Sequence, residues 1–419
     1  MTPRTSTLYR ETLRLGPLAN QELSELLGLS PAGITQMVKP LMANNLFLAL
    51  APDKFDPNRL QSKVETLDLS ITQDPKSKRR KTTFTPNPQF GYLIACQFNQ
   101  RKLELTKLGF DLSIEEEYSY QLPLESALSL PDLVLQEIGV HVREIKTKDN
   151  RHLLGLGIAV AGRIDQETNR ILYSQNIPAI AGLDLAGPLE QELSIPVILV
   201  NDAHAISLGE RLFGEAREMD HALTLFIDQG VGLGIMIHGA PYQGYDQLAG
   251  EPGQLILEPR GKKKPGFVDG SFEAYVSQTA LWEQLEPFRE DEEPHQVYEL
   301  LLKLITQQPE QVAPIIDGLT DSLGLLCTNL FLLLSPQLIS ISGPLTRLNN
   351  PFLTQIKHAI TKYAPEMIGT TLVNRVSLGQ AWEQKMAQGA GFVAAQKFLD
   401  LIDAKGLSEL STRNSPKMG

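Results

Sequence analysis

Residues 228–273 read DQGVGLGIMIHGAPYQGYDQLAGEPGQLILEPRGKKKPGFVDGSFE, and no other stretch of the chain is as informative about its fold. A glycine-rich turn separates two apolar segments, 222–227 and 234–239, which predicts a β-hairpin. The tripeptide AGE follows at 249–251, and a long loop then leads to a lone glutamate, Glu273. The polar residues within this stretch help to decide whether the chain is an enzyme or a regulator.

Around this stretch, strand-like segments alternate with helical ones. Strands are expected at 92–98, 102–110, 153–160, 195–202 and 336–343, and helices at 129–147, through most of 278–334 and at 384–399. This alternation is typical of α/β architecture with a largely parallel sheet. The apolar run from Leu323 to Leu334 is shorter than the roughly 18–20 residues of a membrane helix, so we expect a buried helix and no membrane segment.

Charge is spread unevenly along the 419 residues, a length that predicts more than one domain. The net charge is −11, but residues 1–90 carry 12 Lys/Arg and 8 Asp/Glu, a net of +4, which leaves −15 for the remainder. A basic head on an acidic body is typical of a DNA-binding domain joined to a sensor, with a chance fluctuation as the alternative. Two cysteines and the absence of an apolar signal segment favour a cytoplasmic protein.

The first 45 residues predict three short helices. The first ends at Gly16–Pro17, Asn20 is expected to cap the second, and Gly28 ends it. Ser30 is expected to cap the third helix, with Pro31 at its first position. Their apolar faces would be formed by Leu8, Leu13, Leu15, Leu23, Leu26, Leu27, Ile34, Met37, Val38 and Leu41. This is the helix-turn-helix pattern, in which the third helix enters the major groove of DNA.

The DNA-reading surface is predicted at the start of the third helix. Gln36 is suited to a base edge, Thr35 to a base or a phosphate, and Lys39 to a phosphate. The full set of predicted contacts there is Ser30, Ala32, Gly33, Thr35, Gln36 and Lys39. A helical hairpin that only packs is the alternative. Pro40 lacks a backbone donor and is expected to kink the helix or end it early.

A basic run follows the helices. LFLAL at 46–50 is strand-like, and five of the six residues at 76–81 are Lys or Arg. We expect this run to form the wing of a winged helix, with a solvated linker as the alternative. Its predicted DNA contacts are Lys78, Arg79, Arg80 and Lys81.

Three segments are therefore expected. Residues 1–85 would form a winged helix-turn-helix DNA-binding domain, with TPNP at 85–88 as the boundary before the next strand. Residues 86–403 would form the α/β body, and residues 404–419, rich in Ser, Lys and Pro, a disordered tail.

Six segments, in this order, resemble motifs of the ROK family, which comprises sugar kinases and sugar-sensing repressors. They are SPAGITQMV at 30–38, GLGIAVAGRID at 155–165, SQNIP at 174–178, VNDAHAISLGE at 200–210, AGEPGQ at 249–254 and SPQLISISGP at 335–344. The resemblance covers nearly the whole chain. It implies an actin-like, ribonuclease H-like body of two α/β lobes with a sugar cleft between them, carrying the winged helix-turn-helix of the family's repressors.

The resemblance also implies the sugar-binding residues. Asp202 matches the general base of the family kinases, with Asn201 beside it on the sugar. Asn176, Glu251 and Glu273 match other positions that contact the sugar. Gln254 stands where the family has a histidine; it can form hydrogen bonds but is a poor zinc ligand. The implied sugar-binding set is Asn176, Asn201, Asp202, Glu251, Gln254 and Glu273.

The phosphate and zinc features of the family are missing. Residues 97–101 have neither glycine nor acid where family kinases bind ATP phosphates, and Asp228 and Gln229 alter the second phosphate turn. The loop at 261–271 has no cysteine where the family builds a zinc site. Hence neither ATP nor zinc is expected as a cofactor, and Lys262–Lys264 would pair with nearby acids to hold this loop.

The sequence therefore predicts a cytoplasmic, sugar-responsive transcriptional repressor with a catalytically inactive kinase-like body, in which Asp202 is a vestigial base. The expected partners are operator DNA, a sugar or sugar phosphate, and a second copy of the chain in a homodimer or homotetramer. One alternative is an ATP-dependent sugar kinase that keeps a DNA-binding head. Another is a repressor controlled by a protein partner, with a vestigial sugar cleft.

Overall fold

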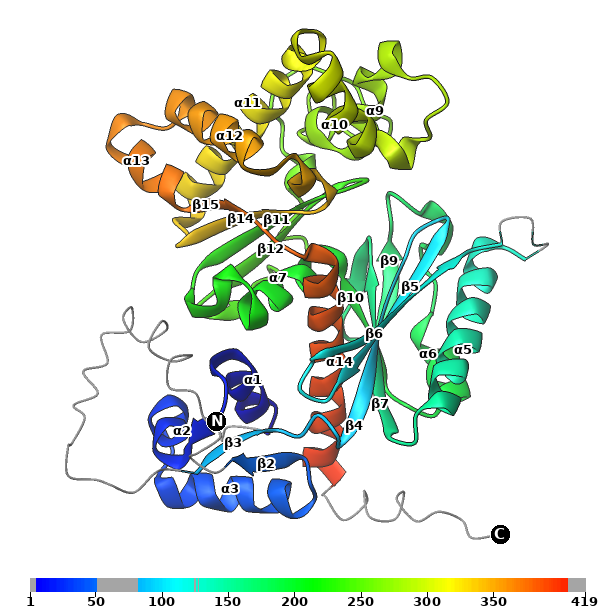
Figure 1. Cartoon of the computed structure of the whole chain (residues 1–419), viewed down its shortest axis with the longest axis vertical. Coiled ribbons are helices and arrows are strands. Elements are labelled where there is room, and N and C mark those ends of the chain that lie inside the picture. The colour runs from blue at the N-terminus through cyan, green and yellow to red at the C-terminus, as the bar shows by residue number, and fades with distance from the viewer. Residues whose placement is uncertain (1–4, 51–81, 124–125, 127, 406–419) are drawn as a thin grey trace.

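The computed structural model describes residues 5–50, 82–123, 126 and 128–405. A small head of helices α1 to α3 lies at one end of the molecule, and a lower and an upper α/β lobe follow along its long axis (Figure 1). Two helices, α7 and α14, lie between these parts (Figure 1). The predicted α/β body behind a helical head is confirmed.

The head is three helices packed on a small sheet. Its elements are α1 (Thr5–Leu15), β1 (Leu18–Ala19), α2 (Asn20–Leu27), α3 (Pro31–Ala43), β2 (Phe47–Leu50) and β3 (Thr83–Pro86). The sheet order is β1-β3-β2, with β3 antiparallel to both neighbours. This is the strand arrangement of a winged helix, and residues 51–82 connect β2 to β3.

The start of the second helix differs from the prediction. Ala19 precedes α2, and its N–H is satisfied by the carboxylate of Glu22 at 2.7 Å. Asn20 is the first helical residue and instead donates from its side chain to Thr35, at 3.1 Å, which ties α2 to α3. Leu26, expected on the apolar face, is 41 % exposed because α2 covers the head core with Leu23.

The third helix is longer than predicted. Ser30 caps it by accepting from the N–H of Gly33 at 3.1 Å, as expected. The helix continues through Pro40 to Ala43, so of the two predicted effects of Pro40, a kink or an early end, the early end was wrong. Leu41, next to Pro40, is buried in the head core, which favours continuation of the helix. Strand β3 extends to Pro86, so the expected boundary after residue 85 falls inside a strand.

The lower lobe contains a five-stranded sheet in the order β10-β7-β4-β5-β6. Its strands are β4 (Gly91–Phe98), β5 (Lys102–Gly109), β6 (Ile114–Gln121), β7 (His152–Val160) and β10 (Val197–Asn201). A hairpin of β8 (Arg163–Asp165) and β9 (Arg170–Tyr173), with helices α5 (Leu130–Lys148) and α6 (Ala186–Leu193), completes the lobe. Strand β6 has the charged sequence IEEEYSYQ and was not predicted, because an edge strand need not have a buried apolar face.

The upper lobe contains a second five-stranded sheet in the order β13-β12-β11-β14-β15. Its strands are β11 (Ala222–Ile227), β12 (Val231–Ile237), β13 (Ala240–Pro241), β14 (Leu338–Ser342) and β15 (Val376–Leu378). Its helices are α8 (Glu273–Val276), α9 (Gln278–Gln284), α10 (Val297–Gln307), α11 (Pro309–Leu334), α12 (Asn349–Tyr363) and α13 (Glu366–Asn374). In each large sheet, two of the four strand pairings are parallel and two are antiparallel, so the sheets are mixed rather than largely parallel.

Helix α11 is long and apolar enough to cross a membrane by length and composition, but 61 % of its apolar window is buried inside the fold. Its buried residues include Leu323, Leu326 and Leu330, which pack in the core of the upper lobe. The predicted buried helix is therefore confirmed.

Helices α7 (Asp202–Phe213) and α14 (Trp382–Lys405) cross each other closely at the centre of the molecule. A Cβ added at Gly209 would lie 2.0 Å from the carbonyl oxygen of Lys385, and one at Gly389 would lie 1.8 Å from that of Ala205. Only glycine fits at such contacts, so these residues set the spacing of the two helices. Residues 404 and 405, expected in a disordered tail, belong to α14, and residues 406–419 lie outside the described residues.

The head is packed directly against the body. The Tyr9 hydroxyl donates to the carbonyl oxygen of Phe110 at 2.5 Å. Thr5 donates from its hydroxyl to Asp403 at the end of α14 at 2.7 Å, and Arg217 donates from its side chain to the carbonyl of Arg14. One continuous apolar cluster includes residues of the head, α7 and α14. The position of the head is thus tied to both central helices.

Candidate functional site

A cavity of about 460 Å³ opens between the two lobes. All six predicted sugar-binding residues line it: Asn176, Asn201, Asp202, Glu251, Gln254 and Glu273. The first three come from the lower lobe and the last three from the upper lobe. Its volume lies within the range of roughly 300–1,000 Å³ that is usual for small-molecule sites.

Asn201 and Asp202 reach the cavity because strand β10 ends there and α7 begins. The Asn201 side chain caps α7 by accepting from the N–H of His204 at 3.1 Å, and it donates to the carbonyl of Gly162 at 3.1 Å. Asp202 accepts from the N–H of Ala203 at 2.8 Å. The predicted strand at 195–202 therefore ends one residue early, which places Asp202 on the first turn of a helix.

Asp202 has the properties of an acid–base group. Burial raises the pKa of its carboxyl to about 7, and the charges of Asp228 and Glu251 act in the same direction. A carboxyl with such a pKa can accept or release a proton near neutral pH. It can also form hydrogen bonds to a sugar hydroxyl in either protonation state.

Glu273 is buried, and both of its carboxylate oxygens already have partners. One oxygen accepts from the N–H of Val231 at 3.0 Å, and the other lies 3.3 Å from the ammonium group of Lys264. Glu273 therefore fixes the start of β12 and the loop at 261–271, in addition to lining the cavity. The sequence motifs alone did not identify these two partners of Glu273. Val231 is 42 positions away in the chain, and Lys264 is one of three adjacent lysines.

Asn176 lies where the two lobes approach each other. Its carbonyl accepts from the side chain of Gln100 at 2.8 Å. A Cβ at Gly230 would come within 2.9 Å of the Asn176 amide nitrogen, so glycine at 230 allows this approach. Across the cavity, Gln254 donates to the side chain of Gln175 at 3.4 Å, which links the two lobes.

The first of the two turns that bind phosphate in family kinases uses several of its backbone donors within the chain. Asn99 accepts from the N–H groups of Arg101 and Lys102 at 2.8 and 2.9 Å. The Asn99 N–H donates in turn to the carbonyl of Lys102 at 3.0 Å. The segment at 97–101 thus turns its backbone donors onto its own side chain rather than toward the cavity.

The second turn is shorter than predicted and is closed in the same way. It spans only Asp228 to Gly230, since β12 begins at Val231. The Asp228 N–H donates to the carbonyl of Gly230 at 2.9 Å, and the N–H of Gln229 bonds to the Asp228 carboxyl. With the Val231 N–H donating to Glu273, three backbone donors around this turn are used within the chain.

The glycines that follow this turn have a packing role, which corrects the expectation that the glycine-rich turn extends from residue 228 to 233. Gly232 and Gly234 lie in β12, where α7 crosses it. A Cβ at Gly232 would lie 2.8 Å from the Cβ of Ala203, and one at Gly234 would lie 2.3 Å from the Cβ of Ser207. These glycines let α7 lie directly on the strand.

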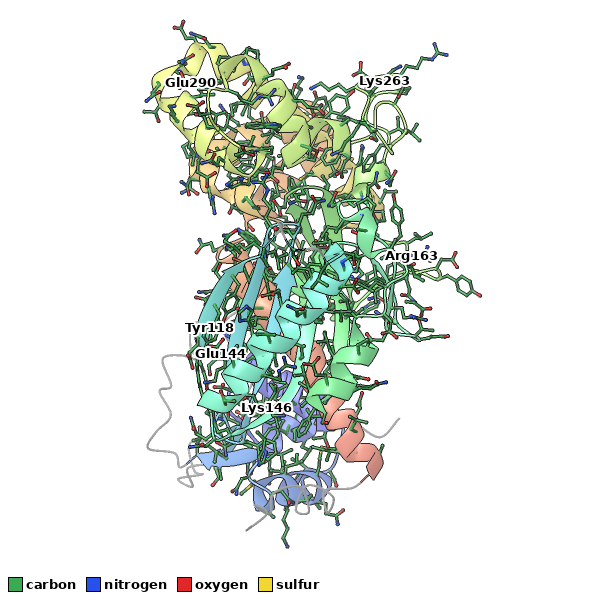
Figure 2. The ribbon with its side chains drawn as sticks, turned by 90° about the vertical axis from the view of Figure 1, so that its right-hand side faces the viewer. Tyr118, Glu144, Lys146, Arg163, Lys263 and Glu290 are labelled. Carbon is green, nitrogen blue, oxygen red and sulfur yellow. The ribbon has the colours of Figure 1, made fainter. Side chains whose placement is uncertain are left out.

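The loop at 261–271 is held by direct contacts. Lys264 donates to Ser277 at 2.8 Å and to Thr279 at 2.5 Å and pairs with Glu273. The backbone N–H of Lys262 donates to the hydroxyl of Tyr275 at 3.0 Å. Figure 2 shows Lys263 at the outer edge of the upper lobe, away from Arg163, which lies where the lobes meet. Among the described residues, no three His, Cys, Asp or Glu side chains are grouped as a metal site needs.

The sequence did not identify several other residues that line the cavity. They include Phe98, Lys102, Glu104, Arg163, Phe226, Trp382 and Met386. Trp382 and Met386 come from the first turns of α14, whose start was predicted at 384. No local motif marks them, because they reach the cavity only through the packing of α14 between the lobes.

The predicted DNA-reading side chains of α3 lie on its outer surface. Ala32, Thr35, Gln36 and Lys39 are exposed, and Gly33 is half-buried. The Ser30 hydroxyl is used as the helix cap, and the Thr35 hydroxyl donates to the carbonyl of Pro31 at 2.9 Å. In Figure 1, α3 lies at the end of the molecule farthest from the upper lobe. The predicted wing contacts Lys78, Arg79, Arg80 and Lys81 lie outside the described residues.

Comparisons with known proteins agree with this geometry. The profile of the ROK family matches residues 107–397. The xylose repressor of Bacillus subtilis is 22 % identical over 94 % of this chain and 95 % of its own, and the glucokinase of Thermotoga maritima is 26 % identical over 57 % of this chain and 78 % of its own. A crystal structure of a ROK family transcriptional regulator, a homologue of the E. coli MLC protein, superposes with a TM-score of 0.73 at 19 % identity, covering 96 % of this chain and 97 % of that one.

Proposed function

The chain belongs to the ROK family, and from this premise we propose that it is a sugar-responsive, DNA-binding transcriptional repressor of carbohydrate genes. The head would bind operator DNA through α3, and the cavity between the lobes would bind the sugar. Repressors similar over nearly the whole chain, head included, support this assignment.

One observation carries the proposal: helix α7 begins in the cavity and ends against the head. Asp202, its first residue, lines the cavity. Near its other end, the Arg211 side chain donates to the carbonyl oxygens of Ala216 and Arg217. Arg217 in turn donates to the carbonyl of Arg14 in α1 of the head. A movement at the sugar site therefore has a short, continuous route to the DNA-binding domain.

Helix α14 provides a second route. Trp382 and Met386 at its start line the cavity, and Asp403 near its end accepts hydrogen bonds from Thr5. A sugar that binds one arrangement of the lobes more tightly than another would shift the populations of these arrangements. Because both helices contact the head, the favoured arrangement would set the spacing of paired heads on DNA.

We propose that the body does not transfer phosphoryl groups. Several backbone donors of both turns are used within the chain, as described for the bonds around Asn99 and Asp228. Asp228 would face the phosphates with a carboxyl group where the family turn has none. Phosphoryl transfer depends on donors and cations that neutralise the growing charge, and neither turn offers them.

Operator binding tests the assignment. The full chain is titrated onto DNA fragments from its own genomic neighbourhood, with and without free sugars and sugar phosphates. Lys39→Ala should weaken operator binding at least tenfold. It should also reduce the slope of the logarithm of the binding constant against the logarithm of the salt concentration by about one, because one phosphate contact is lost. Lys263→Ala removes one positive charge from the upper lobe and should change neither the operator affinity nor its salt dependence. A protein that binds no such fragment would refute the proposal.

A sugar kinase with a DNA-binding head is the second candidate, favoured by the pKa of Asp202 near 7 and by the similarity to a glucokinase. ATP consumption with common hexoses is the measurement. Turnover that Asp202→Asn abolishes would establish this function instead. We expect no turnover in either protein.

A further inference from the structure

The cavity has two chemically different halves. The half between Asn176, Glu251 and Gln254 is polar. The other half is bounded by Phe226, Trp382 and Met386, which belong to one apolar cluster and are called here the apolar wall. The Phe226 and Trp382 rings lie 5.6 Å apart, centre to centre. The six residues implied by the sugar motifs do not include any of this wall.

The apolar wall is built into the fold rather than left by chance. Met386 and Phe226 are buried, at 4 % and 5 % exposure. Ala381, the residue before Trp382, has a φ of +49°, a left-handed conformation that is unfavourable for a residue with a side chain. The backbone thus turns just before α14, which starts between the lobes (Figure 1). Trp382, the first residue of this helix, lines the cavity.

The charges on this side of the cavity oppose an anion. Asp202 and Asp228 have no ion-pair partner within 4 Å among the described residues, whereas Lys102 is paired with Glu104. Burial raises the pKa of Asp228 to about 6, and the charges of Glu104 and Glu383 act in the same direction, against that of Arg347. The other lining cation, Arg163, lies on the polar side beside Glu251 and donates to the carbonyl of Asp246.

A phosphate ester would therefore lack partners here. Its charge would meet two carboxyl groups, and the nearby backbone donors already bond to Asn99, Asp228 and Glu273. An uncharged ring has no such cost, because aromatic side chains and a methionine offer it apolar contact. A single sugar ring held by the polar half would leave the wall uncovered.

We propose that the apolar wall is a second subsite, and that the effector is an uncharged saccharide of more than one ring, or a glycoside with an apolar group, rather than a sugar phosphate. This rests on the proposed sugar-binding function. The first ring would bind in the polar half, and its uncharged substituent would pack against Trp382.

The test uses the two tryptophans of the chain, Trp282 and Trp382. Trp282 lies under the guanidinium of Arg289, 4.3 Å from ring centre to Cζ, and does not line the cavity. Trp282→Phe in the full chain therefore leaves Trp382 as the single fluorescent reporter. This variant is titrated with glucose, glucose 6-phosphate and cellobiose. The free sugar, phosphate and disaccharide of N-acetylglucosamine and of xylose are titrated in the same way, and affinities are checked by calorimetry.

We expect one disaccharide to bind at least tenfold more tightly than its monosaccharide, with a change in Trp382 fluorescence, and the phosphate to bind at least tenfold more weakly. Trp382→Leu, checked for folding by its melting curve, should remove the advantage of the disaccharide and change monosaccharide affinity less than twofold. Asp228→Asn serves as a second variant, and should raise affinity for the phosphate at least threefold without loss of monosaccharide binding.

Tighter binding of the phosphate than of the free sugar would overturn the inference. An equal loss of affinity for the monosaccharide and the disaccharide in Trp382→Leu would do so as well. These outcomes leave the proposed sugar-responsive function intact. If no saccharide binds while operator binding still depends on Lys39, the inference fails together with the sugar-sensing part of the proposed function. If operator binding is absent as well, the whole assignment fails.

Discussion

The Tyr9 hydroxyl, on the first helix of the head, donates a 2.5 Å hydrogen bond to the backbone carbonyl oxygen of Phe110 in the body. The two rings are also in contact, with centres 4.9 Å apart, and Phe392 of α14 stacks on the other side of Tyr9 at 6.3 Å. Tyr9 is fully buried by these contacts. The DNA-binding head is therefore held against the body by a polar bond inside an apolar junction.

Tyr9→Phe should loosen this junction without changing its shape. The carbonyl of Phe110 loses its partner in a buried place, which should cost about 1–3 kcal/mol of unfolding free energy. The effect of a sugar on operator affinity should also fall, because the head would follow the body less closely. Denaturation by urea and operator titration measure the two effects. Tyr118→Phe, on the outer strand β6 (Figure 2), should change neither by more than about 0.5 kcal/mol.

Gly234→Ala should damage the contact of β12 with α7. The new Cβ would come within 2.3 Å of the Ser207 Cβ and 2.7 Å of the Ala203 carbonyl oxygen, so helix and strand would have to move apart. We expect a loss of roughly 2–4 kcal/mol in stability and weaker sugar binding, since Asp202 lies on the same helix. Gly318→Ala is the matched control, because it lies in helix α11 with nothing within 4 Å. It should stabilise the protein by about 0.5–1 kcal/mol, and equal effects of the two changes on melting would refute the packing role.

Asp202→Asn should stabilise the protein while weakening sugar binding. The pKa of the Asp202 carboxyl is about 7 in the fold against 3.8 as the ordinary value, so the folded state holds a proton that the unfolded state releases. Stability from this group is therefore complete below about pH 4 and is lost as the pH rises toward 7. At pH 8 the variant should be more stable by about 2–4 kcal/mol, and near pH 4 the two proteins should melt alike. A constant difference across this pH range would show that another group is responsible.

Lys264→Met should disorder the loop that family members organise with zinc. Glu273 would lose its cation while 3 % exposed, which should cost about 3–5 kcal/mol. Adding Glu273→Gln should restore part of that loss, since no buried charge then remains. EDTA should leave the melting temperature of the wild-type protein unchanged. A drop in melting temperature with EDTA that zinc reverses would mean that a metal holds the loop.

The organisation of the chain could be read from its sequence where the signals are local. Gly28 and Ser30 end and begin helices through contacts within three or four residues, so the helix-turn-helix was recognisable. The six residues predicted to bind sugar could also be selected from the sequence, because five of them lie in short motifs that resemble the ROK family and Glu273 matches a further family position. All six do line one cavity.

The roles of other residues depend on partners far away in the chain. Gly232 was expected in the turn before the second strand, but it lies within β12, and the helix that crosses Gly232 and Gly234 decides that both serve packing. Ala19 rather than Asn20 occupies the capping position of the second helix, and the Asn20 side chain instead donates to Thr35 in the next helix. Charged β6 has no apolar pattern, since an edge strand is stabilised mainly by backbone bonds to β5.

The sequence by itself predicted a helical head followed by an α/β body, because apolar periodicity and helix caps act over a few neighbouring residues. Its resemblance to the ROK family implied the two lobes and the six polar residues that line the cavity. Only the tertiary structure decided that Trp382 reaches the cavity. It also decided that Glu273 accepts a hydrogen bond from Val231 and forms an ion pair with Lys264. It also decided that Tyr9 fastens the head to the body. The physical reason is that burial and hydrogen bonding are satisfied between residues up to hundreds of positions apart, and only their packing in space selects which of them meet.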